Sequence, residues 1–268
     1  MSRIPGYFQL ERYNISPRDI VQLAFHCEPE LIQPRVVLMP SWRVEIFAQV
    51  VPAITEIVPG SVYQLDVQGQ RVSVIRSGIG APQTGDTMLA LGCTPCETAI
   101  FIGSAGGLGK DVRIGDLVVV ERSICGDGFS RYLDTKVIPE DCFQHVAEPD
   151  QQLTDHIKNH AVEACRSRSI SLHNGTVFST DSIMAQFFRL DHIADTLDCI
   201  GIEMETAAFF NAARLVGIKA GALLQVSDLP GRGKSLFAGR TEQEDKERRI
   251  IRQEILSRVV LNSIVFFP

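Results

Sequence analysis

Residues 99–107, AIFIGSAGG, join a short apolar run to a loop of glycine, serine and alanine. Five further runs share the apolar character, and several are rich in β-branched residues: VVLM at 36–39, VSVI at 72–75, DLVVV at 116–120, GTVF at 175–178 and GALLQVS at 221–227. Short, nearly continuous apolar runs are typical of strands that are buried on both faces of a sheet. The chain therefore predicts a sheet that is covered on both sides.

Helix-like patterns lie between these runs. They cover residues 45–57, 85–91, 152–167, 205–216 and 242–265, and in the last of them apolar residues recur at helical spacing. Strands that alternate with helices predict an α/β fold, here a three-layer α/β/α arrangement around a mixed, mostly parallel central sheet. No stretch has the composition of a linker, so we expect a single domain over residues 1–268, with residues 1–24 as an N-terminal extension.

The composition is that of an ordinary globular protein. Among 268 residues, 26 Lys and Arg stand against 32 Asp and Glu, a formal net charge of −6. A nucleic-acid partner needs a basic face and a membrane span needs about 20 consecutive apolar residues, and the sequence suggests neither. The first residues lack the apolar core of a signal peptide, and the seven cysteines are scattered. We therefore expect reduced thiols and a cytoplasmic location.

Two loops rich in glycine and hydroxyl groups follow predicted strands, GIGAPQT at 78–84 and GSAGG at 103–107. Ligands of α/β sheets bind beyond the carboxyl ends of strands, and glycine lets backbone N–H groups approach an anion there. A simple reversal of the chain is the alternative explanation for either loop. A third loop, GRGKS at 231–235, is excluded as a phosphate-binding loop because Asp228 stands where that motif requires its first glycine.

Three carboxylates stand where apolar segments end. Glu203 and Glu205 flank Met204 in GIEMETAA, residues 201–208, where an apolar strand meets an alanine-rich helix. Acids stabilised by the helix dipole are one explanation; the other is that the hydroxyls of a sugar meet Glu203 beside its apolar stretch. Asp228 directly follows GALLQVS, where partial burial would raise its pKa toward that of a useful general acid. A helix or turn cap is the alternative for Asp228.

Seven motifs in a fixed order resemble those of a known enzyme family. They are FHC at 25–27, VLMPSWR at 37–43, SGIGAP at 77–82, IGSAGGL at 102–108, STD at 179–181, GIEMETAA at 201–208 and VSD at 226–228. The chain resembles the nucleoside phosphorylases, the family that includes hexameric purine nucleoside phosphorylase, uridine phosphorylase and methylthioadenosine nucleosidase. The resemblance covers roughly residues 25–265 and implies a nucleoside phosphorylase-like fold.

The resemblance implies how the sugar and the leaving base are held. Glu205 matches the carboxylate that binds the 2′ and 3′ hydroxyls of ribose, Met204 packs under the sugar, and Glu203 lies close to the same hydroxyls. Asp228 matches the acid that protonates N7 of a departing purine, an acid that the uridine-specific branch lacks at this place. His26 matches a histidine that reaches the 5′ hydroxyl of the neighbouring subunit's ligand, which implies a homo-oligomer, either a dimer or a hexamer.

For phosphate, the resemblance implies contacts from Arg43, from Ser104 and from the loop that contains Gly80. Two features depart from the phosphorylase pattern. Phe101 stands where phosphorylases carry an arginine, and Ser-Trp replaces the usual Gly-Asp-Pro before Arg43. Because charge-assisted contacts are the strong ones, the loss of cations weakens phosphate binding, and cleavage by water becomes a rival reaction.

On the base side, Ile183 stands where the family usually has an aromatic residue that stacks on the base. Phe129, in ICGDGFS at 124–130, is a candidate for part of that stacking surface. Gln186 and Arg189 follow at nearly the spacing of the pair that grips uracil in the pyrimidine branch. Solvent-facing loop positions are the alternative for this pair.

The implied reaction is cleavage of the N-glycosidic bond of a purine nucleoside by inorganic phosphate, which gives free base and ribose 1-phosphate. Phosphate is then a co-substrate and no cofactor is expected. The one CxxC, at 93–96, has no second pair, which argues against a metal site. The alternatives are a hydrolytic nucleosidase on the same scaffold, a pyrimidine specificity like that of uridine phosphorylase, and a non-catalytic nucleoside-binding protein.

Overall fold

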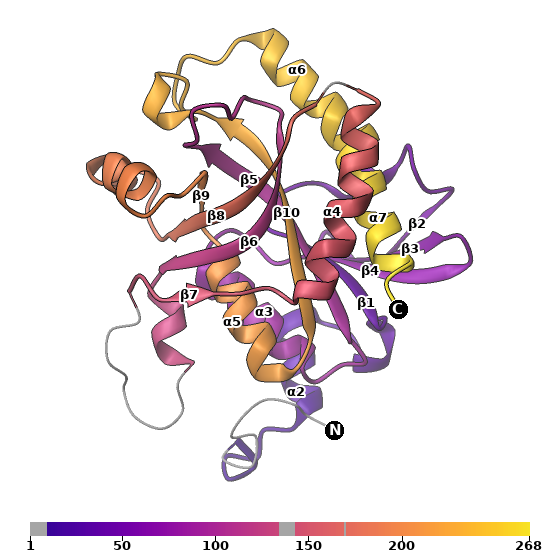
Figure 1. The fold of residues 1–268 in the computed structure, drawn as a ribbon. Coiled ribbons are helices and arrows are strands. Elements are labelled where there is room, and N and C mark those ends of the chain that lie inside the picture. The colour runs from indigo at the N-terminus through magenta and orange to yellow at the C-terminus, as the bar shows by residue number, and fades with distance from the viewer. Residues whose placement is uncertain (1–9, 134–142, 169) are drawn as a thin grey trace.

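The computed structural model describes residues 10–133, 143–168 and 170–268, so residues 1–9 of the expected N-terminal extension lie outside the described part. One sheet of ten strands forms the centre of the described chain, in the order β10-β6-β8-β9-β5-β1-β4-β3-β2 with β7 paired to β6 (Figure 1). The strands are β1 (Arg35–Met39), β2 (Ile54–Val58), β3 (Val62–Val67), β4 (Gln70–Arg76), β5 (Thr98–Gly107), β6 (Leu117–Gly126), β7 (Val146–Ala147), β8 (Leu172–Thr180), β9 (Gly201–Glu203) and β10 (Lys219–Asp228). The principal helices are α2 (Pro17–Phe25), α3 (Ala81–Leu91), α4 (Gln151–Arg166), α5 (Thr206–Val216), α6 (Glu242–Ile251) and α7 (Ser257–Val265).

The predicted α/β fold with a mixed sheet is confirmed. All six apolar runs are strands, and the helical patterns at 85–91, 152–167, 205–216 and 242–265 correspond to α3, α4, α5 and the α6–α7 region. The longest pairings, β5 with β10 and β6 with β8, are parallel, whereas the β2-β3-β4 meander, β9 on β5 and β10 on β6 are antiparallel. No helix in the described ranges is long and apolar enough to cross a bilayer.

The helix expected over residues 45–57 is wrong. Only one 3-10 turn, Val44–Phe47, is helical there, and the segment continues into β2, which pairs antiparallel with β3. Pro52 has no N–H to donate inside a helix, and β2 is rich in β-branched residues that favour a strand. The turn that follows uses Gly60 at φ 74°, a conformation that favours glycine.

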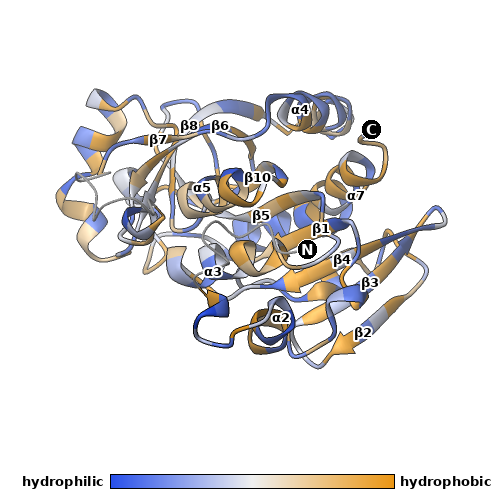
Figure 2. Ribbon diagram, turned by 90° about the horizontal axis from the view of Figure 1, so that it is seen from below, coloured by the Kyte–Doolittle hydropathy of each residue, from blue (hydrophilic) through white to orange (hydrophobic). Residues whose placement is uncertain are grey.

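Alternate residues of the central strands face two different layers of helices. In β1, Val36 and Leu38 belong to a core with residues of α2, α3 and α5, whereas Val37 and Met39 belong to a core with residues of α4 and α7. Figure 2 shows α4 and α7 on one side of β1 and β4, with α2 on the other. Each fully buried aliphatic or aromatic side chain contributes about 1.5–3 kcal/mol, so both faces stabilise the sheet. The three-layer expectation is thereby confirmed.

Five strands pair in a closed cycle: β5 with β10, β10 with β6, β6 with β8, β8 with β9 and β9 with β5. The register places Asp228 beside Gly106, and Gly106 in turn beside Ile202. The carboxyl ends of β5 and β10 therefore meet beside the short strand β9.

The last helical region contacts β10, where the Gln225 side chain donates to the Arg248 carbonyl at 2.9 Å. α6 begins at a capping box, in which the Thr241 hydroxyl accepts from the Glu244 N–H and the Glu244 carboxylate accepts from the Thr241 N–H. A π-helical turn, Arg252–Leu256, then joins α6 to α7. Figure 1 shows α6 at the same end of the molecule as the tips of β5 and β9.

Candidate active site

A cavity of about 230 Å³ opens where β5, β9 and β10 end. Its walls include these residues singled out from the sequence: Ser104, Ile183, Gln186, Glu203, Met204, Glu205 and Asp228. Ligand sites of α/β sheets lie at such strand ends, so the cavity is the candidate active site. Arg43, Gly80, His26, Phe129 and Arg189 are not among the described residues that line it.

The Glu203 carboxylate is held by the protein itself. Its Oε1 accepts from the hydroxyls of Ser179 and Thr206, and its Oε2 accepts from the N–H groups of Glu205 and Thr206, both at 2.8 Å. These N–H groups lie at the start of α5, so Glu203 satisfies donors that a helix N-terminus leaves open. A carboxylate has about four acceptor positions, and these four donors occupy them. Burial raises the pKa of Glu203, and the four hydrogen bonds oppose that rise.

Buried hydroxyls from three elements support Glu203. Ser179 of β8 accepts from the Ala207 N–H at 2.9 Å while it donates to Glu203. Thr206 of α5 lies 2.7 Å from Glu203 Oε1 and 2.8 Å from the hydroxyl of Ser123 on β6. Because each hydroxyl has one proton, Thr206 donates to Glu203 and accepts from Ser123.

Glu205 is the carboxylate that keeps acceptor positions toward the cavity. It is 5% exposed; its Oε1 accepts from the Gly80 N–H at 2.7 Å and its Oε2 from the Met204 N–H at 3.3 Å. Burial and the negative charge of Glu203 raise the pKa of Glu205 to about 8. Two donors on Glu205 against four on Glu203 mean that Glu203 holds the negative charge of the pair more readily.

Asp228 is a buried acid at the end of β10. It is 2% exposed, and its Oδ1 accepts from the Ser227 hydroxyl at 2.5 Å. Burial raises the pKa of Asp228, while Ser227, the charges of Arg240 and Arg248 and the Leu236 N–H lower it. The net direction is upward, which keeps a proton on Asp228 at higher pH than on an exposed aspartate.

The two arginines near Asp228 were not found from the sequence. Arg248 lines the cavity, its Nη2 donates to Asp245 at 2.9 Å, and its Nε is buried without a hydrogen-bond partner among the described residues. Arg240 donates to the Ser227 carbonyl at 3.3 Å. Both residues belong to the strongly charged 240–249 segment, whose pattern gives no sign that one guanidinium faces inward.

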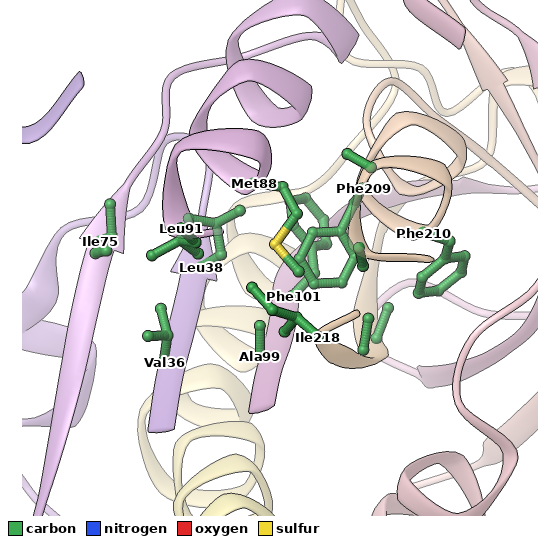
Figure 3. Close-up of a cluster of buried hydrophobic side chains, with 14 of the residues drawn as sticks. Val36, Leu38, Ile75, Met88, Leu91, Ala99, Phe101, Phe209, Phe210 and Ile218 are labelled. Carbon is green, nitrogen blue, oxygen red and sulfur yellow. The ribbon is translucent and has the colours of Figure 1, made fainter. Parts of the chain in front are cut away.

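Of the residues expected at phosphate, only Ser104 lines the cavity. The Gly80 N–H donates to Glu205, and the Arg43 side chain is 82% exposed, with Nη2 3.1 Å from Glu45. Phe101 is fully buried in the core, where its ring centroid lies 5.5 Å from that of Phe209 (Figure 3). The phosphate contacts of Arg43, Gly80 and Ser104 stay predictions.

The residues expected at the base separate into two groups. Ile183 lines the cavity, and so does Gln186, which is 9% exposed and lies on the 3-10 turn Ala185–Phe188. Arg189 is exposed at the end of that turn. Phe129 packs against α3, where a Cβ on Gly85 would lie 2.1 Å from its ring. A solvent-facing position thus describes Arg189 but not Gln186.

His26 lies at the C-terminal end of α2, exposed and at φ 55°, the left-handed conformation of a helix cap. Its neighbour Leu23 is 80% exposed. The contact of His26 with a second subunit stays a prediction.

The chain is similar to known proteins in sequence and in fold. The family model described as the phosphorylase superfamily matches residues 36–264. A DeoD-type purine nucleoside phosphorylase of Xenorhabdus nematophila is 28% identical over 169 residues, which are 60% of this chain and 64% of that protein. The DeoD-type enzyme of Pasteurella multocida is 27% identical over 207 residues, 72% of this chain and 80% of that protein. The structure of uridine phosphorylase from Vibrio fischeri has the same fold, with a TM-score of 0.72 at 20% identity over 87% of this chain and 92% of that one.

Proposed function

The chain belongs to the phosphorylase superfamily, and on that premise we propose that it cleaves the N-glycosidic bond of a purine nucleoside with inorganic phosphate. The products are the free base and ribose 1-phosphate. Relatives that are named purine nucleoside phosphorylase support this substrate class. The observation that carries the proposal is the presence of Glu205 and Asp228 on the walls of one cavity, the first suited to sugar hydroxyls and the second to a leaving base.

Glu205 binds the ribose in this proposal. The 2′ and 3′ hydroxyls of ribose donate to its oxygens, and these hydrogen bonds favour the ionised form of a carboxyl whose pKa is raised to about 8 without the sugar. The Gly80 and Met204 N–H groups fix the orientation of the carboxylate, and Met204 contributes the neighbouring wall of the cavity. Glu203, whose oxygens are occupied, supports the start of α5 rather than the sugar.

Asp228 assists departure of the base. A phosphate oxygen forms a bond to C1′ while the C1′–N9 bond breaks and its electron pair moves onto the purine. The Asp228 proton passes to N7, so the base leaves neutral, and water restores the proton afterwards. Burial favours the protonated acid that this step needs.

Ser104 and the exposed Arg43 bind phosphate in this proposal. The Arg43–Glu45 pair is exposed on both sides, and such pairs contribute about 0–1 kcal/mol. A phosphate dianion offers Arg43 a stronger partner than Glu45, and Ser41, two residues before Arg43, lines the cavity.

Hydrolysis is the second candidate, and one observation favours it. Among the described residues that line the cavity, Arg248 is the one cation, and its Nη2 is tied to Asp245. The buried Phe101 supplies no positive charge. A water molecule needs no such cation, so the same walls suit attack by water on C1′.

We further propose a cytoplasmic homo-oligomer, a dimer or a hexamer, in which His26 reaches the ligand of a neighbouring subunit. Exposed apolar residues beside His26 support a contact surface there: Leu23 is 80% exposed and Leu31 is 43% exposed. Analytical ultracentrifugation tests the assembly. A monomer that cleaves nucleosides, or a His26→Ala variant with unchanged nucleoside KM, contradicts the role of His26.

The function is tested by incubating the protein with inosine, guanosine, adenosine and uridine, with and without phosphate, and identifying the sugar product. Ribose 1-phosphate formed only with phosphate supports phosphorolysis. Free ribose at an equal rate without phosphate supports hydrolysis. Tight nucleoside binding without turnover under either condition supports a binding protein and contradicts both reactions.

A further inference from the structure

We propose that Arg248 makes the site selective for purines with a carbonyl at position 6 over purines with an amino group there. The inference rests on the proposed function and deepens it, because it names the class of base.

Arg248 is built into the wall that holds the acid. It lines the cavity together with Asp228, Ser227 and Leu236, and its side chain is 15% exposed. Both side chains line this one cavity, and the charge of each acts on the other. A base that receives a proton from Asp228 therefore shares the cavity with the guanidinium.

The guanidinium has donors in excess of its partners. It has five N–H groups and no acceptor. Nη2 donates to Asp245, while Nε is buried without a hydrogen-bond partner among the described residues. A buried donor that lacks an acceptor is costly, so this group gains most from a ligand that offers one.

The edge of a purine decides which base fits. N7 and O6 of a 6-oxopurine lie side by side and both accept, whereas adenine has an acceptor at N7 and an amino donor at position 6. Asp228 donates to N7, and Arg248 then donates to O6. The amino group of adenine would instead face a cation that has only donors.

The charge that develops on the leaving base also favours 6-oxopurines over adenine. Negative charge that develops on a leaving 6-oxopurine is shared with O6, where a fixed guanidinium stabilises it. The 6-amino group of adenine cannot accept from the guanidinium in this way. Arg248 therefore affects kcat/KM for inosine and guanosine more than for adenosine.

The neighbours of Arg248 favour a base over phosphate as its partner. Asp228 shares its wall, and the carboxylate formed after proton transfer would repel a dianion. Leu236 contributes apolar surface, which suits a flat ring.

The test compares kcat/KM for inosine, guanosine, adenosine and uridine in the wild type and in Arg248→Met, which keeps the length and removes the donors. We expect the wild type to prefer inosine over adenosine by about 100-fold and Arg248→Met to bring this ratio near 1, chiefly through loss of inosine cleavage. Arg248→Lys, which keeps one cation, gives an intermediate ratio and serves if Arg248→Met fails to fold. The exposed neighbour Arg249→Gln is the matched control and leaves the ratio unchanged.

Three results would overturn the proposal. They are equal wild-type cleavage of inosine and adenosine, an equal loss for both nucleosides in Arg248→Met, and a raised phosphate KM at an unchanged base ratio, which would make Arg248 a phosphate ligand. If the wild type cleaves no nucleoside, the proposed function fails. Calorimetry with hypoxanthine and adenine then decides base selectivity separately: tighter hypoxanthine binding that Arg248→Met abolishes upholds it, and equal binding contradicts it.

Discussion

The backbone N–H of Gly80 donates a hydrogen bond of 2.7 Å to Oε1 of Glu205, across 125 residues of the chain. The bond joins the loop after β4 to the start of α5. The glycine-rich loop therefore orients an acid of the cavity through its backbone, and its N–H is engaged before any anion arrives.

Gly80→Ala tests this contact. Gly80 has φ 99°, and an added Cβ would meet only Pro82 Cδ at 3.9 Å, so the cost is backbone strain rather than a clash. Such strain costs about 1–3 kcal/mol. We expect a lower Tm together with a nucleoside KM raised several-fold, because the loop shifts away from Glu205. Gly60→Ala is the control: φ is 74° and nothing lies within 4 Å, so its Tm falls while KM stays. Equal nucleoside KM values in Gly80→Ala and Gly60→Ala would contradict a role of the Gly80 contact in orienting Glu205.

Glu205→Gln should stabilise the protein at alkaline pH and impair its activity. The pKa of Glu205 is raised from 4.5 to about 8, so the folded protein retains a proton that the unfolded chain releases, and stability is lost as pH rises from 4.5 to 8. Each pKa unit corresponds to about 1.4 kcal/mol. Thermal melts should therefore show a higher Tm than the wild type at pH 8 and no difference at pH 4, with nucleoside KM raised. A lower Tm at pH 8 would show that the ionised carboxylate stabilises the fold.

Asp228→Asn should lower kcat for purine nucleosides by about 10²–10⁴-fold, the usual contribution of a general acid. Nucleoside KM should change little, because Glu205 still binds the sugar. The wild-type rate should fall at alkaline pH as Asp228 ionises, at a pH above that of an ordinary aspartate since burial raises its pKa. Steady-state kinetics from pH 5 to 9 measure both effects. Full activity of the asparagine variant would remove Asp228 from the reaction.

Arg43 and Glu45 should have opposite effects on phosphate. Arg43→Gln removes the cation and should raise phosphate KM about tenfold, whereas Glu45→Gln releases Arg43 and should lower it. Neither should change Tm, because the pair is exposed. Rates measured against phosphate concentration check this. If the rates of both variants do not depend on phosphate concentration, hydrolysis is favoured.

Phe101→Arg should unfold the protein rather than create a phosphate site. Phe101 is fully buried and packs against Phe209, so an arginine there has no partner for its charge. We expect a loss above about 4 kcal/mol, against about 1–2 kcal/mol for Phe101→Leu. Thermal melts compare the two. A folded Phe101→Arg protein with tighter phosphate binding would show that this position faces the cavity.

Local patterns predicted most of the secondary structure, and the exception is informative. Nearly continuous apolar runs such as 99–103 and 221–227 are typical of strands buried on both faces. The apolar residues at 242–265 recur at the spacing of a helix and not at that of a strand. The helical spacing in the segment 45–57 is interrupted by Pro52, which cannot continue a helix. Residues 54–58 instead pair antiparallel with β3, a contact that the local pattern does not contain.

The sequence by itself determined which residues stand where strands end. Glu203, Glu205 and Asp228 were placed there by periodicity and composition, which depend only on neighbours in the chain. Tertiary structure decided what each of them does: four donors occupy Glu203, the Gly80 N–H orients Glu205, and Arg248 joins Asp228 while Arg43 stays outside. The physical reason is that hydrogen bonding and burial are set by strand register and by the closed cycle of strands. These bring together groups that are far apart in the sequence, and no local pattern encodes which of them meet.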